Sequence, residues 1–209
     1  MENAIWVVGS GGHARSIIGV LESLGKPVSA AKHIVNKLGL PDLGQSVISE
    51  SEALDSKSMA HGEVFFGFVG DQLGVRQQKI EELESKGVKF SGFSAPTALL
   101  SRRAVIDDSA QIFEGSYVGP GSSIGRHCVV NTGATIEHDC LIGDFSHISV
   151  RAILLGSVQI GEKVYVGGGA VLLPGINVGE GAIIGAGSVV TRDVPPNSKV
   201  LGSPARPTT

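Results

Sequence analysis

The chain has 209 residues, of which 42% are hydrophobic, so it is long enough for one or two packed domains. Its 17 basic and 20 acidic side chains give a net charge of −3, which argues against nucleic-acid and anionic-membrane partners. No apolar stretch resembles a signal peptide or could span a bilayer, so we expect a cytoplasmic protein.

Residues 1–92 alternate short apolar runs with amphipathic segments, which is typical of a sheet covered by helices. We predict strands at Ala4–Val8, Val28–Ala31, Val64–Val69 and Val88–Phe90. We predict helices at Arg15–Leu24, Ser51–Ser58 and Asp71–Lys86. The order of these elements predicts an α/β domain with a small Rossmann-like parallel sheet.

The first predicted strand is followed by a glycine turn, Gly9-Ser10-Gly11-Gly12-His13-Ala14, and then by a helix. This Gly-x-Gly-x-x-Ala pattern lets backbone N–H groups approach a phosphate at the helix N-terminus. The region from Lys32 to Asn36 has no carboxylate to hold ribose hydroxyls, so a redox dinucleotide is not expected. A turn with a purely structural role is the alternative.

A strict six-residue repeat organises the rest of the chain. Every sixth residue from Leu100 to Val190 is Leu, Ile or Val, and a mostly small residue follows four positions later. Neither a helix nor an ordinary strand has this period, whereas the stacked short strands of a parallel β-helix do, with 18 residues in each three-sided coil. We therefore predict a β-helix at 93–190 and a Pro-rich tail at 191–209.

The two cysteines and one histidine of this repeat are candidates for a chemical role. Cys128 and Cys140 both occupy the small position, which predicts two buried free thiols in a reducing compartment. His138 lies between Glu137 and Asp139, and its neighbours 18 residues away are Pro120 and Gly156. A carboxylate beside a histidine can orient the ring as a general base.

The solenoid contains two other histidines, His127 and His147. His127 stacks with Ser109 and Phe145 by the 18-residue rule, and we interpret it as a surface residue. Zinc ligands on one column would be multiples of 18 apart, and His127, His138 and His147 are not, so no metal is expected. A zinc enzyme of the γ-carbonic anhydrase type is thus a weaker hypothesis.

The solenoid repeat resembles the left-handed β-helix of the hexapeptide-repeat acyltransferases, and its handedness is implied by that resemblance. The Gly9–Ala14 turn, the Gly70-Asp71 pair and the Gly202–Ala205 segment extend the likeness over nearly the whole chain. In these features the sequence is similar to bacterial nucleotide-sugar acetyltransferases such as the UDP-bacillosamine and perosamine N-acetyltransferases, with the sialic acid O-acetyltransferases as relatives.

The resemblance implies a homotrimer that transfers acetyl from acetyl-CoA to the amino group of a nucleotide-linked amino sugar. It implies that His138 is the base and Asp139 its partner, and that substrate contacts come from Ser10, Gly11, Gly12, His13 and Gly70. It also implies acetyl-CoA contacts at His147, Gly156, Gly168 and Ala186. Two alternatives stay open: a sugar O-acetyltransferase, and a trimeric scaffold that binds sugar nucleotides without catalysis.

Overall fold

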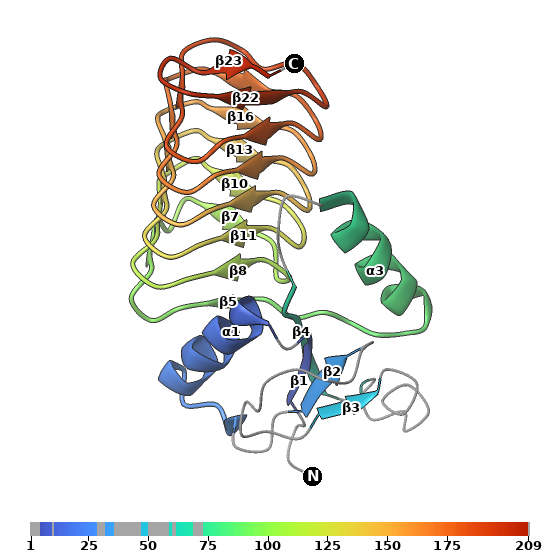
Figure 1. Cartoon of the computed structure of the whole chain (residues 1–209). Coiled ribbons are helices and arrows are strands. Elements are labelled where there is room, and N and C mark those ends of the chain that lie inside the picture. Colours follow the sequence, from blue (N-terminus) through green and yellow to red (C-terminus); the bar gives the residue numbers. More distant parts are fainter. Residues whose placement is uncertain are drawn as a thin grey trace. The chain divides into compact units, whose positions relative to one another are not determined.

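The computed structural model describes residues 5–9, 11–28, 32–35, 47–49, 59, 62–68 and 73–208. The chain divides into two compact units, one of residues 1–69 with 78–91 and one of residues 70–77 with 92–209. The first unit is an α/β domain with a parallel sheet, and the second is a left-handed parallel β-helix of about six turns (Figure 1).

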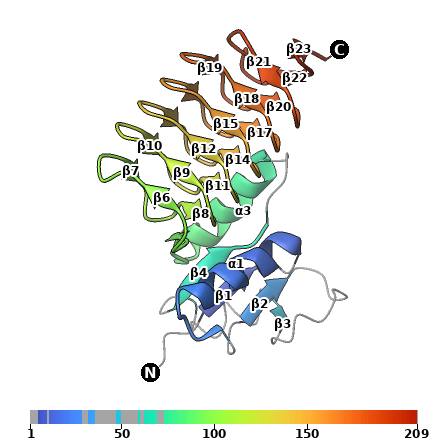
Figure 2. The ribbon, with the colours of Figure 1, turned by 90° about the vertical axis from the view of Figure 1, so that its left-hand side faces the viewer.

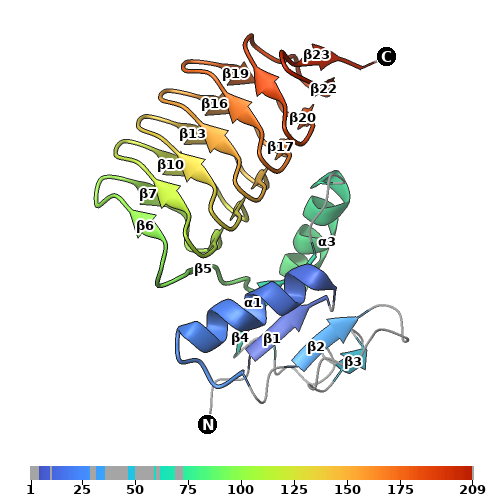
Figure 3. The same ribbon diagram turned by 60° about the vertical axis from the view of Figure 1, so that its left-hand side comes forward.

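The α/β unit has a four-stranded parallel sheet in the order β3-β2-β1-β4. The strands are β1 (Ile5–Val8), β2 (Lys32–Val35), β3 (Val47–Ser49) and β4 (Glu63–Phe66). Two helices follow β1 and β4: α1 (Gly12–Ser23) and α3 (Leu73–Ser85). Helix α1 lies along the sheet (Figure 3) and buries Ala14, Ile17, Ile18, Val20 and Leu21. The sequence therefore predicted the class of this unit correctly.

Two predicted strands of this unit were wrong in position or extent. The second strand begins at Lys32 rather than at Val28, because Val28 donates its N–H to Lys26 O (2.8 Å) in a turn around Pro27. Residues 88–90 contribute only a single bridge, between Phe90 and Val64, since the chain enters the solenoid at Gly92. The strand β3 was not predicted. The predicted helix Ser51–Ser58 lies outside the described residues.

The solenoid has three sheets that run along its axis (Figure 2). The five-stranded sheet contains β7 (Val105–Ile106), β10 (Ser123–Ile124), β13 (Leu141–Ile142), β16 (Gln159–Ile160) and β19 (Asn177–Val178). The six-stranded sheet contains β6 (Leu99–Leu100), β9 (Tyr117–Val118), β12 (Thr135–Ile136), β15 (Ile153–Leu154), β18 (Val171–Leu172) and β21 (Val189–Val190). The eight-stranded sheet contains β5 (Phe93–Ser94), β8 (Gln111–Ile112), β11 (Val129–Val130), β14 (His147–Ile148), β17 (Tyr165–Val166), β20 (Ile183–Ile184), β22 (Lys199–Leu201) and β23 (Arg206–Pro207).

The six-residue repeat explains this packing directly. Parallel neighbours pair 18 residues apart, as Ile136 does with Val118 and with Leu154. The second residue of each strand points into the core, and the small residue of each repeat fills the corner between two sheets. Cys128 and Cys140 are buried and free, as predicted.

Residues after Val190 continue the solenoid. Val194 forms a bridge with Val178, and β22 pairs in parallel with β20. The short strand β23 then pairs antiparallel with β22 and covers its open edge. This hairpin closes the C-terminal end of the stack, where an unpaired strand would invite association with another chain.

Candidate active site

The pair His138 and Asp139 lies on the corner between β12 and β13, where the six-stranded and five-stranded sheets meet. The Nδ1 atom of His138 is 2.9 Å from Oδ2 of Asp139. The side chains are 58% and 66% exposed, so the pair is open to a ligand. Since a carboxylate accepts hydrogen bonds, the contact favours the tautomer with the proton on Nδ1, which leaves Nε2 as the basic nitrogen.

Gly156 makes room for the imidazole ring of His138. It lies one coil after His138, and Ser157 N–H donates to His138 O (2.8 Å) between the two corners. A Cβ atom at Gly156 would be 2.4 Å from Nε2 of His138 and 2.5 Å from Cε1. Only glycine therefore leaves room for the ring in this position, and the 18-residue register predicted this neighbour correctly.

Two other residues predicted to contact acetyl-CoA, Gly168 and Ala186, lie on a different edge of the solenoid from His138. Gly168 and Ala186 are on successive corners between the eight-stranded and six-stranded sheets, linked by a hydrogen bond from Gly187 N–H to Gly168 O (2.9 Å). Gly168 is half-buried and Ala186 is exposed. Within one chain the structure therefore does not bring this pair together with His138, because the width of the six-stranded sheet separates the two edges.

His147 begins β14 and is only 3% exposed. Its Nε2 is 3.3 Å from the side-chain amide of Asn131, and its ring meets that of Tyr165 edge-on with centroids 5.2 Å apart. The contact with Asn131 was missed in the sequence because the two residues are 16 rather than 18 positions apart. Asn131 lies between β11 and β12, on the same edge of the solenoid as Gly168.

The glycine turn of the α/β unit leads into the N-terminus of α1. Gly11 caps this helix, followed by Gly12 and His13, and a Cβ atom at either glycine would meet nothing within 4 Å. Gly9 has φ +120°, and a Cβ atom there would be 2.8 Å from Gly67 O. The backbone N–H groups at the start of a helix are a favourable place for a phosphate. Ser10 and Gly70 lie outside the described residues.

The interpretation of His127 as a surface residue was wrong. His127 is 2% exposed, and its ring packs against that of Phe145 with centroids 5.1 Å apart. Its carbonyl oxygen accepts a hydrogen bond from Arg76 (3.1 Å). Among the described residues no group of three His, Cys, Asp or Glu side chains could hold a metal ion.

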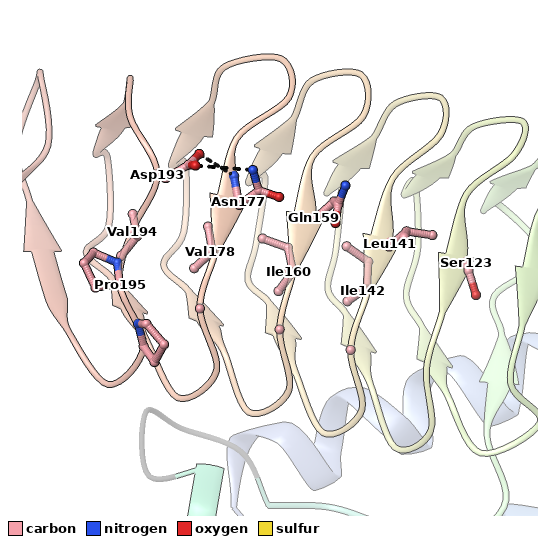
Figure 4. Close-up of a pocket in the computed structure, with 14 residues that line it drawn as sticks. Ser123, Leu141, Ile142, Gln159, Ile160, Asn177, Val178, Asp193, Val194 and Pro195 are labelled. Carbon is pink, nitrogen blue, oxygen red and sulfur yellow. Dashed lines mark hydrogen bonds between the residues drawn. The ribbon is translucent and has the colours of Figure 1, made fainter.

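A shallow groove of about 640 Å³ runs over the five-stranded sheet (Figure 4). Ser123, Leu141, Gln159 and Asn177 face it from successive strands. At its C-terminal end Asp193 accepts hydrogen bonds from the backbone N–H (2.8 Å) and the side-chain amide (3.3 Å) of Asn177. The lining of this groove does not include His138.

A left-handed β-helix of hexapeptide repeats with an exposed His-Asp pair defines a hexapeptide-repeat transferase. The family model described as bacterial transferase hexapeptide (six repeats) matches residues 157–192. The chain is similar to the acetyltransferase domain of PglB from Neisseria gonorrhoeae FA1090, solved with acetyl coenzyme A, at 30% identity over 100% of both chains and a TM-score of 0.90.

Two further solved structures are similar to this chain over nearly their full length. Perosamine N-acetyltransferase from Caulobacter crescentus, solved with CoA and GDP-perosamine as a variant with one histidine replaced by asparagine, has 26% identity over 100% of this chain and 98% of that chain, with a TM-score of 0.91. WeeI from Acinetobacter baumannii AYE has 25% identity over 98% and 99%, with a TM-score of 0.89. The chain belongs to the hexapeptide-repeat nucleotide-sugar N-acetyltransferases.

In the described part of the chain, helices are too short or too polar to cross a membrane.

Proposed function

We propose that this protein transfers acetyl from acetyl-CoA to the amino group of a nucleotide-linked amino sugar, with His138 as general base. The observation that carries the proposal is the geometry of the ring. Nδ1 of His138 is 2.9 Å from the Asp139 carboxylate, and Nε2 lies against Gly156, where any side chain would collide with the ring. An imidazole held in this way can accept a proton at Nε2 while the carboxylate stabilises the imidazolium.

The reaction proceeds by direct transfer. The amine nitrogen attacks the thioester carbon while Nε2 of His138 takes one amine proton. The tetrahedral oxyanion is stabilised by a backbone N–H, which we assign to Gly156 because this residue adjoins the ring. The C–S bond then breaks, and the proton on Nε2 passes to the CoA sulfur. No acyl-enzyme is formed, and the nearby Cys140 is buried.

The acetyl-CoA site is proposed to lie between two copies of the chain. Gly156 is on one edge of the solenoid, whereas Gly168 and Ala186 are on another. His147, which the resemblance implies as a further contact, is buried in the single chain. A single acetyl-CoA can contact both groups of residues if the Gly156 edge of one copy faces the Gly168 edge of the neighbouring copy. A heterologous contact forms a closed ring when the rotation between copies closes, and we propose a ring of three copies, a homotrimer. The relatives solved with acetyl-CoA or CoA support the donor.

The six-stranded sheet separates these two edges, and we propose that it faces the other copies. Its outward positions are nearly all apolar: Leu99, Tyr117, Thr135, Ile153, Val171 and Val189. Leu99 is 67% exposed and Ile153 is 36% exposed in the single chain. The outward positions of the five-stranded sheet include the polar Gln159 and Asn177 instead. An apolar strip of this kind is typical of a protein interface.

The nucleotide is assigned to the N-terminus of α1, where Gly11, Gly12 and His13 lie, together with Ser10 and Gly70. The relative solved with GDP-perosamine supports an amino-sugar acceptor over a sugar hydroxyl. Buried free thiols fit a reducing compartment, which supports a cytoplasmic location.

Ligand binding tests this assignment first. UDP-, dTDP-, GDP- and CMP-linked amino sugars are screened by thermal shift with the full chain, because a ligand that binds the native state raises its melting temperature. We expect one nucleotide class to raise the melting temperature and then to be acetylated, with release of free CoA thiol. A response to acetyl-CoA alone, followed by acetylation of free sugar hydroxyls, would favour the O-acetyltransferase.

A further inference from the structure

The corner that carries the proposed base, residues 137–140, is here named the catalytic turn. Its two ends are held by one buried hydroxyl from the preceding coil. Ser122 is 1% exposed, and its hydroxyl donates to Glu137 O (2.7 Å) and accepts from Cys140 N–H (3.0 Å). The hydroxyl therefore bridges the two groups between which His138 and Asp139 lie.

Other corners on the same edge of the described solenoid are closed without a bridge. One coil before the catalytic turn, Ser122 N–H donates directly to Gly119 O (3.4 Å). Two coils after it, Ile176 N–H donates directly to Leu173 O (3.4 Å). The residues beneath these corners are Ala104 and Val158, which have no group to insert. The bridge thus depends on a hydroxyl or thiol at the small position of the preceding coil.

Cys140 repeats the arrangement one coil further on. Its thiol donates to Leu155 O (3.3 Å) and accepts a hydrogen bond from the backbone N–H of Val158. This second bridged corner contains Gly156. On this edge, one bridged corner therefore carries His138 and the next bridged corner carries Gly156, which lies beside the His138 ring.

We infer that Ser122 is a positioning residue for His138, an inference that rests on the proposed role of His138 as the base. Without the hydroxyl, Cys140 N–H can donate directly to Glu137 O. The backbone groups of the corners over Ala104 and Val158 bond directly in this way. That closure rotates the peptide groups of the catalytic turn and displaces the imidazole from the Asp139 carboxylate. Displacements of about 1 Å at reacting groups lower rates by on the order of a hundredfold.

The test compares two matched serine variants of the full chain. Ser122→Ala removes the bridge at the catalytic turn. Ser146→Ala is the control, because Ser146 is equally buried and makes the same bridge to Gly161 O (2.8 Å) and Val164 N–H (3.0 Å) on another edge. We expect both variants to lower the melting temperature by similar amounts. Ser122→Val, which introduces the residue type present two coils later, replaces Ser122→Ala if the latter does not fold.

The readout is the tautomer of His138, observed by NMR in protein labelled with ¹⁵N-histidine, since the two ring nitrogens differ in shift when one carries the proton. The His138 signals are assigned by their loss in His138→Asn. Ser122→Ala is expected to move them toward the position seen in Asp139→Asn, with a larger fraction protonated on Nε2. Ser146→Ala should leave them unchanged, and Ser122→Cys should restore most of the wild-type shift.

His138 signals that stay at the wild-type position in Ser122→Ala would overturn the inference, as would an equal change in Ser146→Ala. Failure of the proposed function is recognised separately: His138→Ala would then keep its acetyl-transfer rate, whatever the NMR spectra of the serine variants.

Discussion

At the scale of single residues, the geometry of the catalytic turn depends on a glycine beneath it. Asp139 has a left-handed backbone (φ 59°), and its carboxylate lies over Gly121 of the preceding coil. A Cβ atom at Gly121 would be 2.3 Å from Oδ1 of Asp139. The same arrangement recurs away from the site, where a Cβ atom at Gly181 would be 2.4 Å from Oδ1 of Asn197.

This recurrence supplies a matched pair of substitutions. Gly121 and Gly181 have φ of +77° and +68°, so alanine at either position costs about 1 to 3 kcal/mol of stability through backbone strain. We expect Gly121→Ala alone to reduce acetyl transfer strongly, because it displaces the carboxylate that orients His138. Urea unfolding and steady-state kinetics of both variants check this. Equal activities would show that the position of Asp139 is not critical.

The two thiols give a second prediction at this scale. Burial raises the pKa of the Cys128 thiol to about 12 and also raises that of Cys140. The reactive thiolate is therefore scarce at pH 8, and it becomes accessible only when the chain unfolds. We expect neither cysteine to react with a thiol reagent such as DTNB in the native protein and both to react in urea. Rapid labelling of Cys140 in the folded state would contradict its placement.

At the scale of elements, the aliphatic repeat predicted the parallel β-helix and the inward-facing residue of its short strands, because an 18-residue coil sets the register of neighbouring coils. The irregular parts could not be predicted in this way. The strand at Lys32–Val35 depends on a turn at Pro27, and the pairing of β22 follows a proline-rich segment without the repeat. The hydrogen bond from Arg76 to the His127 carbonyl joins two residues that are 51 positions apart in the sequence.

Arg76 on α3 is itself a testable feature of the second unit. Its guanidinium is 3% exposed and donates to the carbonyl oxygens of His127 and Phe145, two corner residues with left-handed backbones. Burial lowers the pKa of Arg76 to about 10, which leaves it charged at neutral pH.

Arg76→Met should lower the free energy of unfolding by about 2 kcal/mol, since it leaves two buried carbonyls without this donor. The control is Arg126→Met on the same edge, whose ion pair with Asp144 is exposed at the arginine and should contribute at most about 1 kcal/mol. Chemical denaturation of both variants measures the difference. A larger loss for Arg126 would refute the role of Arg76.

At the scale of the whole molecule, the proposal requires a trimer that buries the six-stranded sheet. Ile153→Glu places a charge on the outward face of this sheet and should dissociate the assembly. Gln159→Glu, on the outward face of the five-stranded sheet, should leave it intact. Sedimentation velocity measures the oligomeric state of the wild type and of both variants. A wild-type monomer, or a trimer that tolerates Ile153→Glu, would mean that the two edges do not meet as proposed.

The central claim is that His138 removes the proton from a sugar amine as it attacks acetyl-CoA. The most direct measurement is the rate of acetyl transfer by the wild type and by His138→Asn, with acetyl-CoA and GDP-perosamine or its UDP- and dTDP-linked 4-amino counterparts. Thiol release and the mass of the product are both recorded. We predict that kcat falls by ~10² to 10⁴-fold, as expected for loss of a general base, with the KM for acetyl-CoA little changed. Transfer by His138→Asn within a few-fold of the wild type would contradict the account.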